Sequence, residues 1–306
     1  MEDIRGLADL LPKPVAYVFG GGGSYGAVQM GMVRALAETS LRPDLVVGTS
    51  VGALNGVMVA ANPDTAAGML SGIWPQIERK HVFPGNVVTQ ALAARSSRPW
   101  LFDPGPLSDL ITVNLPVLVI EELALPFVAV ATDLDTGVRV DLDSGDIRSA
   151  LLASSAIPGV FPWVERDGRR LVDGGLVANV PVRQAVERGA KSVVVLDCGL
   201  FGIDGRWARS LVNVIVQALT ITARQQIVAD LQVAQQVPVV YLPTPSSITS
   251  TLFDFSHTEA LAADAYEEAR QLLAALALHR DVLRPGLYGE PPVAVHDPTV
   301  SDLIRW

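Results

Sequence analysis

The amino-acid sequence predicts an α/β fold built around a mostly parallel sheet. Two short β-rich segments between residues 14 and 61 are each followed by a glycine-containing break and a helical pattern, and this alternation continues towards the C-terminus. The 306 residues are 49% hydrophobic and 18% charged, which supports a large core and excludes a disordered chain. We expect an N-terminal extension (1–13), one main domain (14–280) and a Pro-rich C-terminal tail (281–306).

The first βα unit has a run of glycines between its strand and its helix. Pro14–Phe19 is β-rich, Gly20–Gly26 forms the glycine loop, and Ala27–Glu38 has a helical pattern. Such a loop leaves several backbone N–H groups uncovered at a helix N-terminus, where negative charge is favoured. These amides are therefore candidates for an oxyanion hole.

The same loop also fits the dinucleotide pattern G-x-G-x-x-G through Gly21, Gly23 and Gly26. A dinucleotide site needs an acidic residue at the end of the second strand to hold the ribose. That strand ends here in Val47-Gly48-Thr49-Ser50, with no acid. An oxyanion hole is favoured, and nucleotide binding stays open as the alternative.

The second βα unit carries the G-x-S-x-G pattern. Asp44–Val47 is a predicted strand, Gly48-Thr49-Ser50-Val51-Gly52 follows it, and Ala53–Ala61 has a helical pattern. A serine on a sharp strand-to-helix turn presents its hydroxyl outward, and the flanking glycines permit the tight backbone. Ser50 is the candidate nucleophile, with a plain tight turn as the alternative.

Residues 65–125 are predicted to be an inserted helical region, because the helical pattern is broken by Trp74-Pro75, Phe83-Pro84-Gly85 and Arg98-Pro99-Trp100. Two strands follow, and the repeats Asp133–Gly137 and Asp141–Gly145 are interpreted as hairpin turns instead of calcium loops, since they lack the required Gly and Glu positions. The remaining predicted elements are the strands Phe127–Thr132, Val138–Leu142, Trp163–Arg166, Arg169–Val172, Ser192–Leu196 and Pro238–Leu242, and the helices Pro181–Arg188, Ala208–Gln235 and Thr258–His279. The tail after Arg280 is expected to wrap the surface.

A nucleophilic serine needs a base, and Asp173 is the best-placed candidate. It ends the second strand of a hairpin whose turn is Asp167-Gly168, and two glycines follow it. An aspartate of ordinary pKa near ~3.9 is a weak base, so this role requires desolvation and a short hydrogen bond. The alternative is an ordinary Asp-Gly turn. His81 in the insert is the only plausible triad histidine, and a packing or solvated role fits it better; His257, His279 and His296 lie at helix ends or in the tail.

The chain resembles the patatin-like phospholipase family over about residues 14–198. Four motifs stand in the family's order: the glycine loop Gly20–Gly26, the G-x-S-x-G segment Gly48–Gly52, the segment Ala153-Ser154-Ser155-Ala156-Ile157-Pro158-Gly159-Val160-Phe161-Pro162, and Asp173-Gly174-Gly175. The resemblance implies a three-layer α/β sandwich with a central, mostly parallel sheet. It also implies acyl-ester hydrolysis of phospholipids, lysophospholipids or neutral lipids by a Ser–Asp dyad, with no metal or other cofactor.

In this resemblance Ser50 is the nucleophile and Asp173 the base, and Ser154 and Ser155 are structural. The oxyanion would be held by backbone amides of Gly21, Gly22, Gly23 and Val51. The glycines that support the motifs are Gly26, Gly48, Gly52, Gly174 and Gly175. Two positions depart from the family pattern: Tyr25 replaces a basic residue of the glycine loop, and Leu176–Pro181 contains the single Asn179.

Two other functions stay open: an acyltransferase with the same dyad, and a non-catalytic lipid- or nucleotide-binding module. The insert's apolar residues are equally typical of an acyl channel or lid and of ordinary packing; they are Ile73, Trp74, Val82, Phe83, Trp100, Leu101 and Phe102.

Charge, cysteine content and hydrophobic runs limit the partners and the location. The 23 Lys and Arg against 32 Asp and Glu give a net charge of −9, and no basic run is present, so nucleic acid is not expected as a partner. The single cysteine, Cys198, and an acidic N-terminus without signal-peptide character favour the cytoplasm. No apolar run reaches the ~18 uncharged residues of a membrane span. Transient contact with a membrane surface is compatible with this composition, and the oligomeric state is not predicted.

Overall fold

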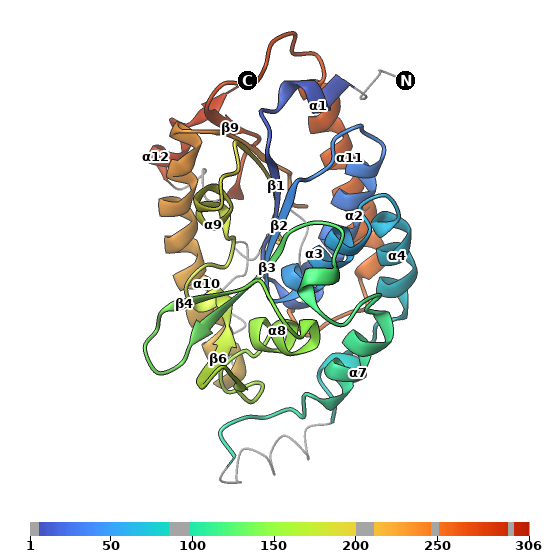
Figure 1. Cartoon of the computed structure of the whole chain (residues 1–306), viewed down its shortest axis with the longest axis vertical. Helices are drawn as coiled ribbons and strands as arrows, with labels where there is room; N and C mark the ends of the chain where they lie inside the picture. Colours follow the sequence, from blue (N-terminus) through green and yellow to red (C-terminus); the bar gives the residue numbers. More distant parts are fainter. Residues whose placement is uncertain (1–5, 86–97, 200–210, 246–250, 293–296, 306) are drawn as a thin grey trace.

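The computed structural model describes residues 6–85, 98–199, 211–245, 251–292 and 297–305. Within them, ten strands form one sheet in the order β10-β9-β8-β7-β1-β2-β3-β6-β5, and β4 pairs with β3 (Figure 1). Pairing is parallel from β10 to β3 and antiparallel among β3, β4, β5 and β6. The strands are β1 Val15–Phe19, β2 Leu45–Thr49, β3 Phe127–Asp133, β4 Arg139–Leu142, β5 Val164–Arg166, β6 Arg169–Asp173, β7 Ser192–Leu196, β8 Pro238–Tyr241, β9 Gly286–Tyr288 and β10 Ile304–Arg305.

Helices cover both faces of this sheet. On one side lie α2 (Gly26–Ala37), α3 (Val51–Ala61) and α11 (Thr258–Leu276); on the other lie α9 (Val182–Glu187), α10 (Leu211–Asp230) and α12 (Pro298–Ser301) (Figure 1). The other helices are α1 Leu7–Leu10, α4 Ala66–Ile73, α5 Arg79–Val82, α7 Gly105–Asn114 and α8 Ile147–Ser154. Short 3-10 turns occur at Gly23–Tyr25, Trp74–Gln76, Ile120–Glu122, Gly174–Leu176 and Leu231–Gln235.

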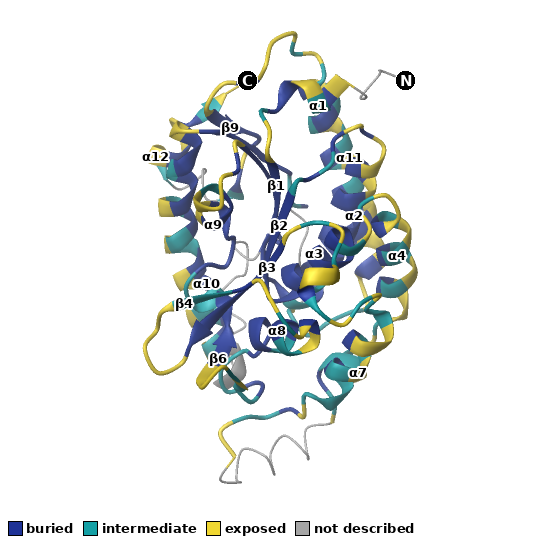
Figure 2. Cartoon of the chain, viewed as in Figure 1, coloured by how far each residue is buried: buried dark blue, intermediate teal, exposed yellow. Residues whose placement is uncertain are grey.

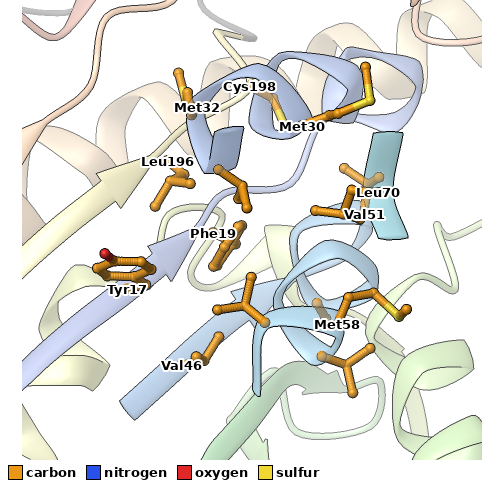
Figure 3. Close-up of a cluster of buried hydrophobic side chains, with 14 of the residues drawn as sticks. Tyr17, Phe19, Met30, Met32, Val46, Val51, Met58, Leu70, Leu196 and Cys198 are labelled. Carbon is orange, nitrogen blue, oxygen red and sulfur yellow. The ribbon is translucent and has the colours of Figure 1, made fainter. Parts of the chain in front are cut away.

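The central strands are buried on both faces because a parallel sheet needs helices on each side. Every residue of β1, β2, β3, β7 and β8 is buried (Figure 2). Side chains alternate along β1, so Tyr17 and Phe19 join the core under α2 and α3, whereas Ala16 and Val18 join the core under α9 and α10. Figure 3 shows part of the core under α2 and α3. The predicted three-layer α/β sandwich with a mostly parallel sheet is confirmed.

The inserted region packs as α4, α5 and α7 on the α3 side of the sheet (Figure 1). Residues 86–97 of the predicted insert lie outside the described residues, and so does the start of the helix predicted over Ala208–Gln235. The helices α1, α8 and α12 were not predicted. For α8 a local signal exists, because Asp146 caps it by accepting a hydrogen bond from the Ser149 amide at 2.6 Å.

The tail was expected on the surface, and this expectation is wrong for β9, whereas β10 is a partly exposed edge strand. β9 pairs in parallel with β8 and is buried, and β10 pairs with β9. The Leu283 amide also donates to the Leu10 carbonyl at 2.8 Å, which joins the tail to α1. A three-residue strand among Pro and Gly gives almost no period-2 signal, so sequence reasoning missed it.

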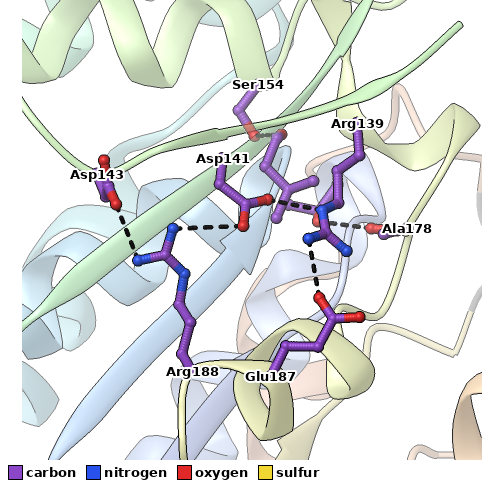
Figure 4. Close-up of polar contacts among 9 residues, drawn as sticks. Arg139, Asp141, Asp143, Ser154, Ala178, Glu187 and Arg188 are labelled. Atoms are coloured by element: carbon purple, nitrogen blue, oxygen red, sulfur yellow. Dashed lines mark hydrogen bonds and ion pairs between the residues drawn. The ribbon is translucent and has the colours of Figure 1, made fainter.

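The acidic repeats of the β3–β4 region differ from each other. Asp133 begins a hairpin turn and accepts hydrogen bonds from the amides of Asp135 and Thr136, as predicted. The second repeat is not a hairpin turn: Asp141 lies within β4, and the chain then enters α8. Its acids pair with Arg139 of β4 and Arg188 just after α9, which ties the hairpin to that helix (Figure 4).

Candidate active site

Ser50 stands at the junction of β2 and α3. Its φ of 55° and ψ of −129° lie in a region that non-glycine residues rarely adopt, so the backbone is strained there. The side chain is only 8% exposed. Because Val51 is the first residue of α3, its N–H has no acceptor within the helix. This is the geometry of a nucleophile elbow.

Hydrogen bonds from distant segments hold the strained turn. The Ser50 amide donates to Ser154 Oγ at 2.9 Å, and Ser154 Oγ donates to the Val130 carbonyl at 2.6 Å. Thr49 Oγ1 donates to the Ala178 carbonyl at 2.7 Å. Ser154 is fully buried and binds backbone on both sides, which fits the structural role expected for it.

The glycines of the elbow allow close backbone contact. A Cβ atom on Gly52 would lie 2.3 Å from the Phe19 carbonyl oxygen, and one on Gly48 would lie 2.6 Å from the Gly52 carbonyl oxygen. Similarly, a Cβ on Gly26 would lie 2.4 Å from a methyl group of Val51, and one on Gly174 would lie 2.3 Å from the Val130 carbonyl oxygen. A side chain at any of these positions would separate the elbow from its neighbours.

The sheet register brings Asp173 level with Ser50. Thr49 of β2 is opposite Val130 of β3, and the next β3 residue, Ala131, is opposite Asp173 of β6. Ser50 and Asp173 therefore lie on either side of the same residue of β3, about two strand spacings (~10 Å) apart at the backbone. Their side chains can meet across that gap over the small side chain of Ala131.

Burial changes the acidity of Asp173. The residue is 6% exposed, and desolvation raises the pKa of its carboxyl group to about 6. The Gly175 amide, which donates to Asp173 Oδ1 at 2.8 Å, and a hydrogen bond with the Ser50 side chain both lower this pKa and limit the rise. A carboxylate with a pKa near 6 is ionised at neutral pH and is a stronger base than an exposed aspartate.

The glycine loop supplies fewer free amides than the sequence suggested. Gly21 was expected to donate to an oxyanion, but its N–H already donates to the Asn179 carbonyl at 3.0 Å. Within the described ranges, the amides of Gly22 and Gly23 have no acceptor, and both residues border the cavity that contains Ser50 and Asp173. Gly23 has a φ of +56°, which glycine adopts without strain.

A buried polar network supports this loop, and sequence reasoning did not identify it. Gln29 Nε2 donates to the carbonyls of Gly20 and Leu196, both at 2.8 Å. Asn55 Nδ2 donates to Gln29 Oε1 at 2.7 Å, and Trp74 Nε1 donates to Asn55 Oδ1 at 2.9 Å. The only signal in the sequence was an amide residue within each of two mostly apolar helices. Tyr25, the departure from the family pattern, is fully buried in the core.

Two cavities meet at Ser50. The first, here called the apolar cavity, has a volume of about 110 Å³ and is walled by apolar side chains of α3, α4, α7 and α8 together with Ser50. The second, the Asp173 cavity, has a volume of about 50 Å³ and is bordered by Ser50, Asp173, Gly22 and Asn179, with α10 on its far side. Gly23, Phe83 and Ile157 border both cavities and so divide them.

The apolar residues of the insert fall into two groups. Ile73, Trp74, Val82 and Phe83 line the apolar cavity. Phe102 packs edge-on against Phe83, and Trp100 packs against Trp163, at centroid distances of 5.5 and 6.0 Å. The remaining residue, Leu101, packs against the same core without lining the cavity.

The remaining candidate groups have other roles. His81 Nδ1 accepts a hydrogen bond from the Glu78 amide at 3.1 Å, which caps α5 and leaves the imidazole outside both cavities. Among the described residues, no three His, Cys, Asp or Glu side chains lie together as a metal site would require. None of the helices in the described ranges combines the length and the apolar character needed to cross a bilayer.

Comparison with known proteins identifies the family. A family model for patatin-like phospholipases matches residues 17–186, more than half of the chain. Mouse patatin-like phospholipase domain-containing protein 7 is 31% identical over 204 residues, covering 65% of this chain and 14% of the mouse protein. An uncharacterized NTE family protein of Mycobacterium bovis is 31% identical over 169 residues, covering 55% of this chain and 44% of that protein. The matches therefore span less than half of either relative.

Among solved structures, VipD from Legionella pneumophila aligns with a TM-score of 0.44 at 15% identity, covering 86% of this chain and 67% of VipD. This likeness is too distant to bear on function. The match to the family model is stronger evidence, because it spans all four sequence motifs from the glycine loop to Asp173-Gly174-Gly175. The resemblance inferred from those motifs is confirmed: the chain belongs to the patatin-like phospholipase family.

Proposed function

We propose that this protein is a serine hydrolase of lipid acyl esters. Ser50 is the nucleophile, Asp173 is the base, and the amides of Gly22, Gly23 and Val51 stabilise the oxyanion. The observation that carries the proposal is a strained, buried serine level with a buried carboxylate whose pKa is about 6. Membership of a family of phospholipases supports a lipid substrate.

The reaction proceeds through an acyl-enzyme. Asp173 takes the hydroxyl proton as Ser50 Oγ bonds to the ester carbonyl carbon, and the carbonyl oxygen becomes an oxyanion held by the amides. Collapse of this intermediate breaks the bond to the alcohol, and Asp173 returns the proton to the leaving oxygen. Water then attacks the acyl-enzyme, Asp173 takes one of its protons, and collapse releases the fatty acid and restores the Ser50 hydroxyl.

The position of Asp173 assigns the two halves of the substrate. The base must reach both the leaving alcohol and the attacking water, and Asp173 borders only the second cavity. We therefore assign the alcohol and the water to the Asp173 cavity and the acyl chain to the apolar cavity. Almost all side chains of the apolar cavity are hydrocarbon, which suits a fatty acyl chain.

The first experiment measures hydrolysis of p-nitrophenyl esters by the wild type, Ser50→Ala, Asp173→Asn and Ser71→Ala. Ser71 is a control serine, since its hydroxyl donates to the Ala67 carbonyl on α4, outside both cavities. We expect Ser50→Ala and Asp173→Asn to lose at least ~10³-fold in kcat, with Ser71→Ala unchanged. Equal folding is verified by circular dichroism. Full activity in either of the first two variants contradicts the mechanism.

An acyltransferase is the second candidate, and the walls of the Asp173 cavity favour considering it. Leu176, Val216 and Leu219 line the side from which the acceptor approaches, so the cavity can take an alcohol that carries hydrocarbon. Adding glycerol or a lysolipid would then convert part of the released acid into a new ester. Unchanged release of free acid with every acceptor excludes transfer. If the wild type cleaves no ester, a lipid-binding module replaces both candidates.

A further inference from the structure

One face of α3 forms a continuous wall of the apolar cavity. Val51, Leu54, Asn55 and Met58 all border it, and their spacing of three and four residues places them on the same side of the helix. Met58 is the last α3 residue on this wall. Just beyond it, the Leu125 amide donates to the Ala60 carbonyl at 3.0 Å, so the chain that precedes β3 crosses α3 at that point.

The length of this wall follows from helix geometry. An α-helix rises 1.5 Å per residue, so the eight residue steps from Ser50 to Met58 span about 12 Å along the axis. An extended chain of single bonds advances about 1.2 Å per bond, as the polypeptide backbone does. The wall therefore matches about ten bonds of an extended acyl chain that starts at the Ser50 hydroxyl.

Other helices enclose the same length of cavity. Leu70 of α4 and Leu151 of α8 border it and are almost completely buried. Leu151 lies one turn before Ser154, whose hydroxyl accepts a hydrogen bond from the Ser50 amide, so the last turn of α8 is anchored at the start of α3. Leu115 continues the wall from the end of α7. The cavity is thus bordered by side chains on several sides along the α3 face.

We infer that the acyl chain lies along this face of α3 and that Met58 limits the length of chain that fits. The preferred substrates are then medium-chain esters with an acyl group of about ten carbons. The inference rests on the proposed hydrolase function and on the assignment of the acyl chain to the apolar cavity. Met58 acts by occupying space and touches only the end of the chain. Leu54, one turn closer to Ser50, borders the middle of the chain.

The test uses p-nitrophenyl esters from acetate to palmitate, because the alcohol is constant and only the acyl chain varies. For each enzyme, kcat/KM is plotted against acyl length. The wild type is expected to be most active near the decanoate. Met58→Ala removes three heavy atoms, so the ratio of kcat/KM for dodecanoate to that for octanoate should rise at least ~10-fold. Met58→Trp should lower the same ratio by a similar factor.

Met30→Ala is the matched control. Met30 and Met58 are both 4% exposed and belong to the same buried cluster, but Met30 does not border the cavity (Figure 3). Its dodecanoate to octanoate ratio should equal that of the wild type. Leu54→Trp is a second variant for the case in which Met58→Trp does not fold, and it should shift the optimum below octanoate.

The two proposals fail in different ways. An active wild type whose length profile is the same in Met58→Ala, Leu54→Trp and Met30→Ala overturns the assignment of Met58 and leaves the hydrolase intact. An active wild type that prefers palmitate likewise overturns the limit at about ten carbons. Absence of Ser50-dependent activity with every ester overturns the proposed function instead.

Discussion

The raised pKa of Asp173 predicts opposite effects of pH on activity and on stability. The proposed base works only when it is ionised, so kcat/KM should follow ionisation of a group with a pKa of about 6. About one tenth of the enzyme is then active at pH 5 and about nine tenths at pH 7. We expect kcat/KM to fall about ten-fold for each pH unit well below 6 and to be constant above 7.

The same shift has a cost in folding free energy. The pKa of the carboxyl rises from 3.8 to about 6 on folding, so the folded state binds this proton more tightly than the unfolded state does. The contribution of Asp173 protonation to folding stability is therefore fully present at low pH and is lost as pH rises from about 4 to 6. The difference of about two pKa units corresponds to about 3 kcal/mol at pH 7.

Asp173→Asn separates the two effects. The variant should be inactive, and it should be more stable than the wild type by up to ~3 kcal/mol at pH 7.5, because the neutral amide avoids the desolvation of a charge. That advantage should disappear near pH 4. The measurements are kcat/KM from pH 4.5 to 8 and urea unfolding of both proteins at pH 4 and 7.5.

Asp230 provides the control, since partial burial raises its pKa to about 6 as well, although Arg183 pairs with it on the other side of the sheet. Asp230→Asn should keep the acid limb of the activity profile. The reasoning is refuted if wild-type kcat/KM is constant between pH 4.5 and 7.5 with the fold intact, or if Asp173→Asn is less stable than the wild type at pH 7.5.

Three further substitutions examine the supports of the site. Ser154→Ala should lower kcat about ten-fold with little change in KM and destabilise the protein by ~2–3 kcal/mol, because the Ser50 amide and the Val130 carbonyl lose their partner. Steady-state kinetics measure the first effect and urea unfolding measures the second. Gly52→Ala should destabilise by more than ~3 kcal/mol, since its Cβ would overlap the Phe19 carbonyl, and an unchanged unfolding midpoint would contradict this close contact. Trp74→Phe should lower the free energy of unfolding by ~1–3 kcal/mol in the same assay, because the side-chain oxygen of Asn55 loses its only donor among the described residues.

The elements of the site that were predictable from sequence are those encoded by neighbouring residues. The elbow could be located because G-x-S-x-G, a β-branched run and an apolar helix are contiguous. The strand end at Asp173 followed from the Asp167-Gly168 turn, which fixes the hairpin locally. In both cases the chemistry and the secondary structure depend on the same few residues.

What the sequence did not reveal depends on contacts between distant segments. The Gly21 amide is not free because it donates a hydrogen bond to the backbone carbonyl of Asn179, a residue far away in the sequence. Ser154 was expected to be structural, but its hydrogen-bond partners, the Ser50 amide and the Val130 carbonyl, depend on where α8 ends relative to β2 and β3. The strand β9 was missed because its three residues are ordered by pairing with β8 rather than by a local pattern. No local propensity carries that information.

The register around β3 gives a physical reason why two residues can be enough for the proposed chemistry. In a serine–histidine–aspartate triad the third residue orients the base. Here the Gly175 amide donates to Asp173 Oδ1 and orients the carboxylate, and Thr132 Oγ1 donates to the backbone carbonyl of Asp173 and holds the main chain at this residue. The second carboxylate oxygen is left for the Ser50 proton. Burial supplies the basicity that an imidazole would otherwise provide, at the cost in stability argued above.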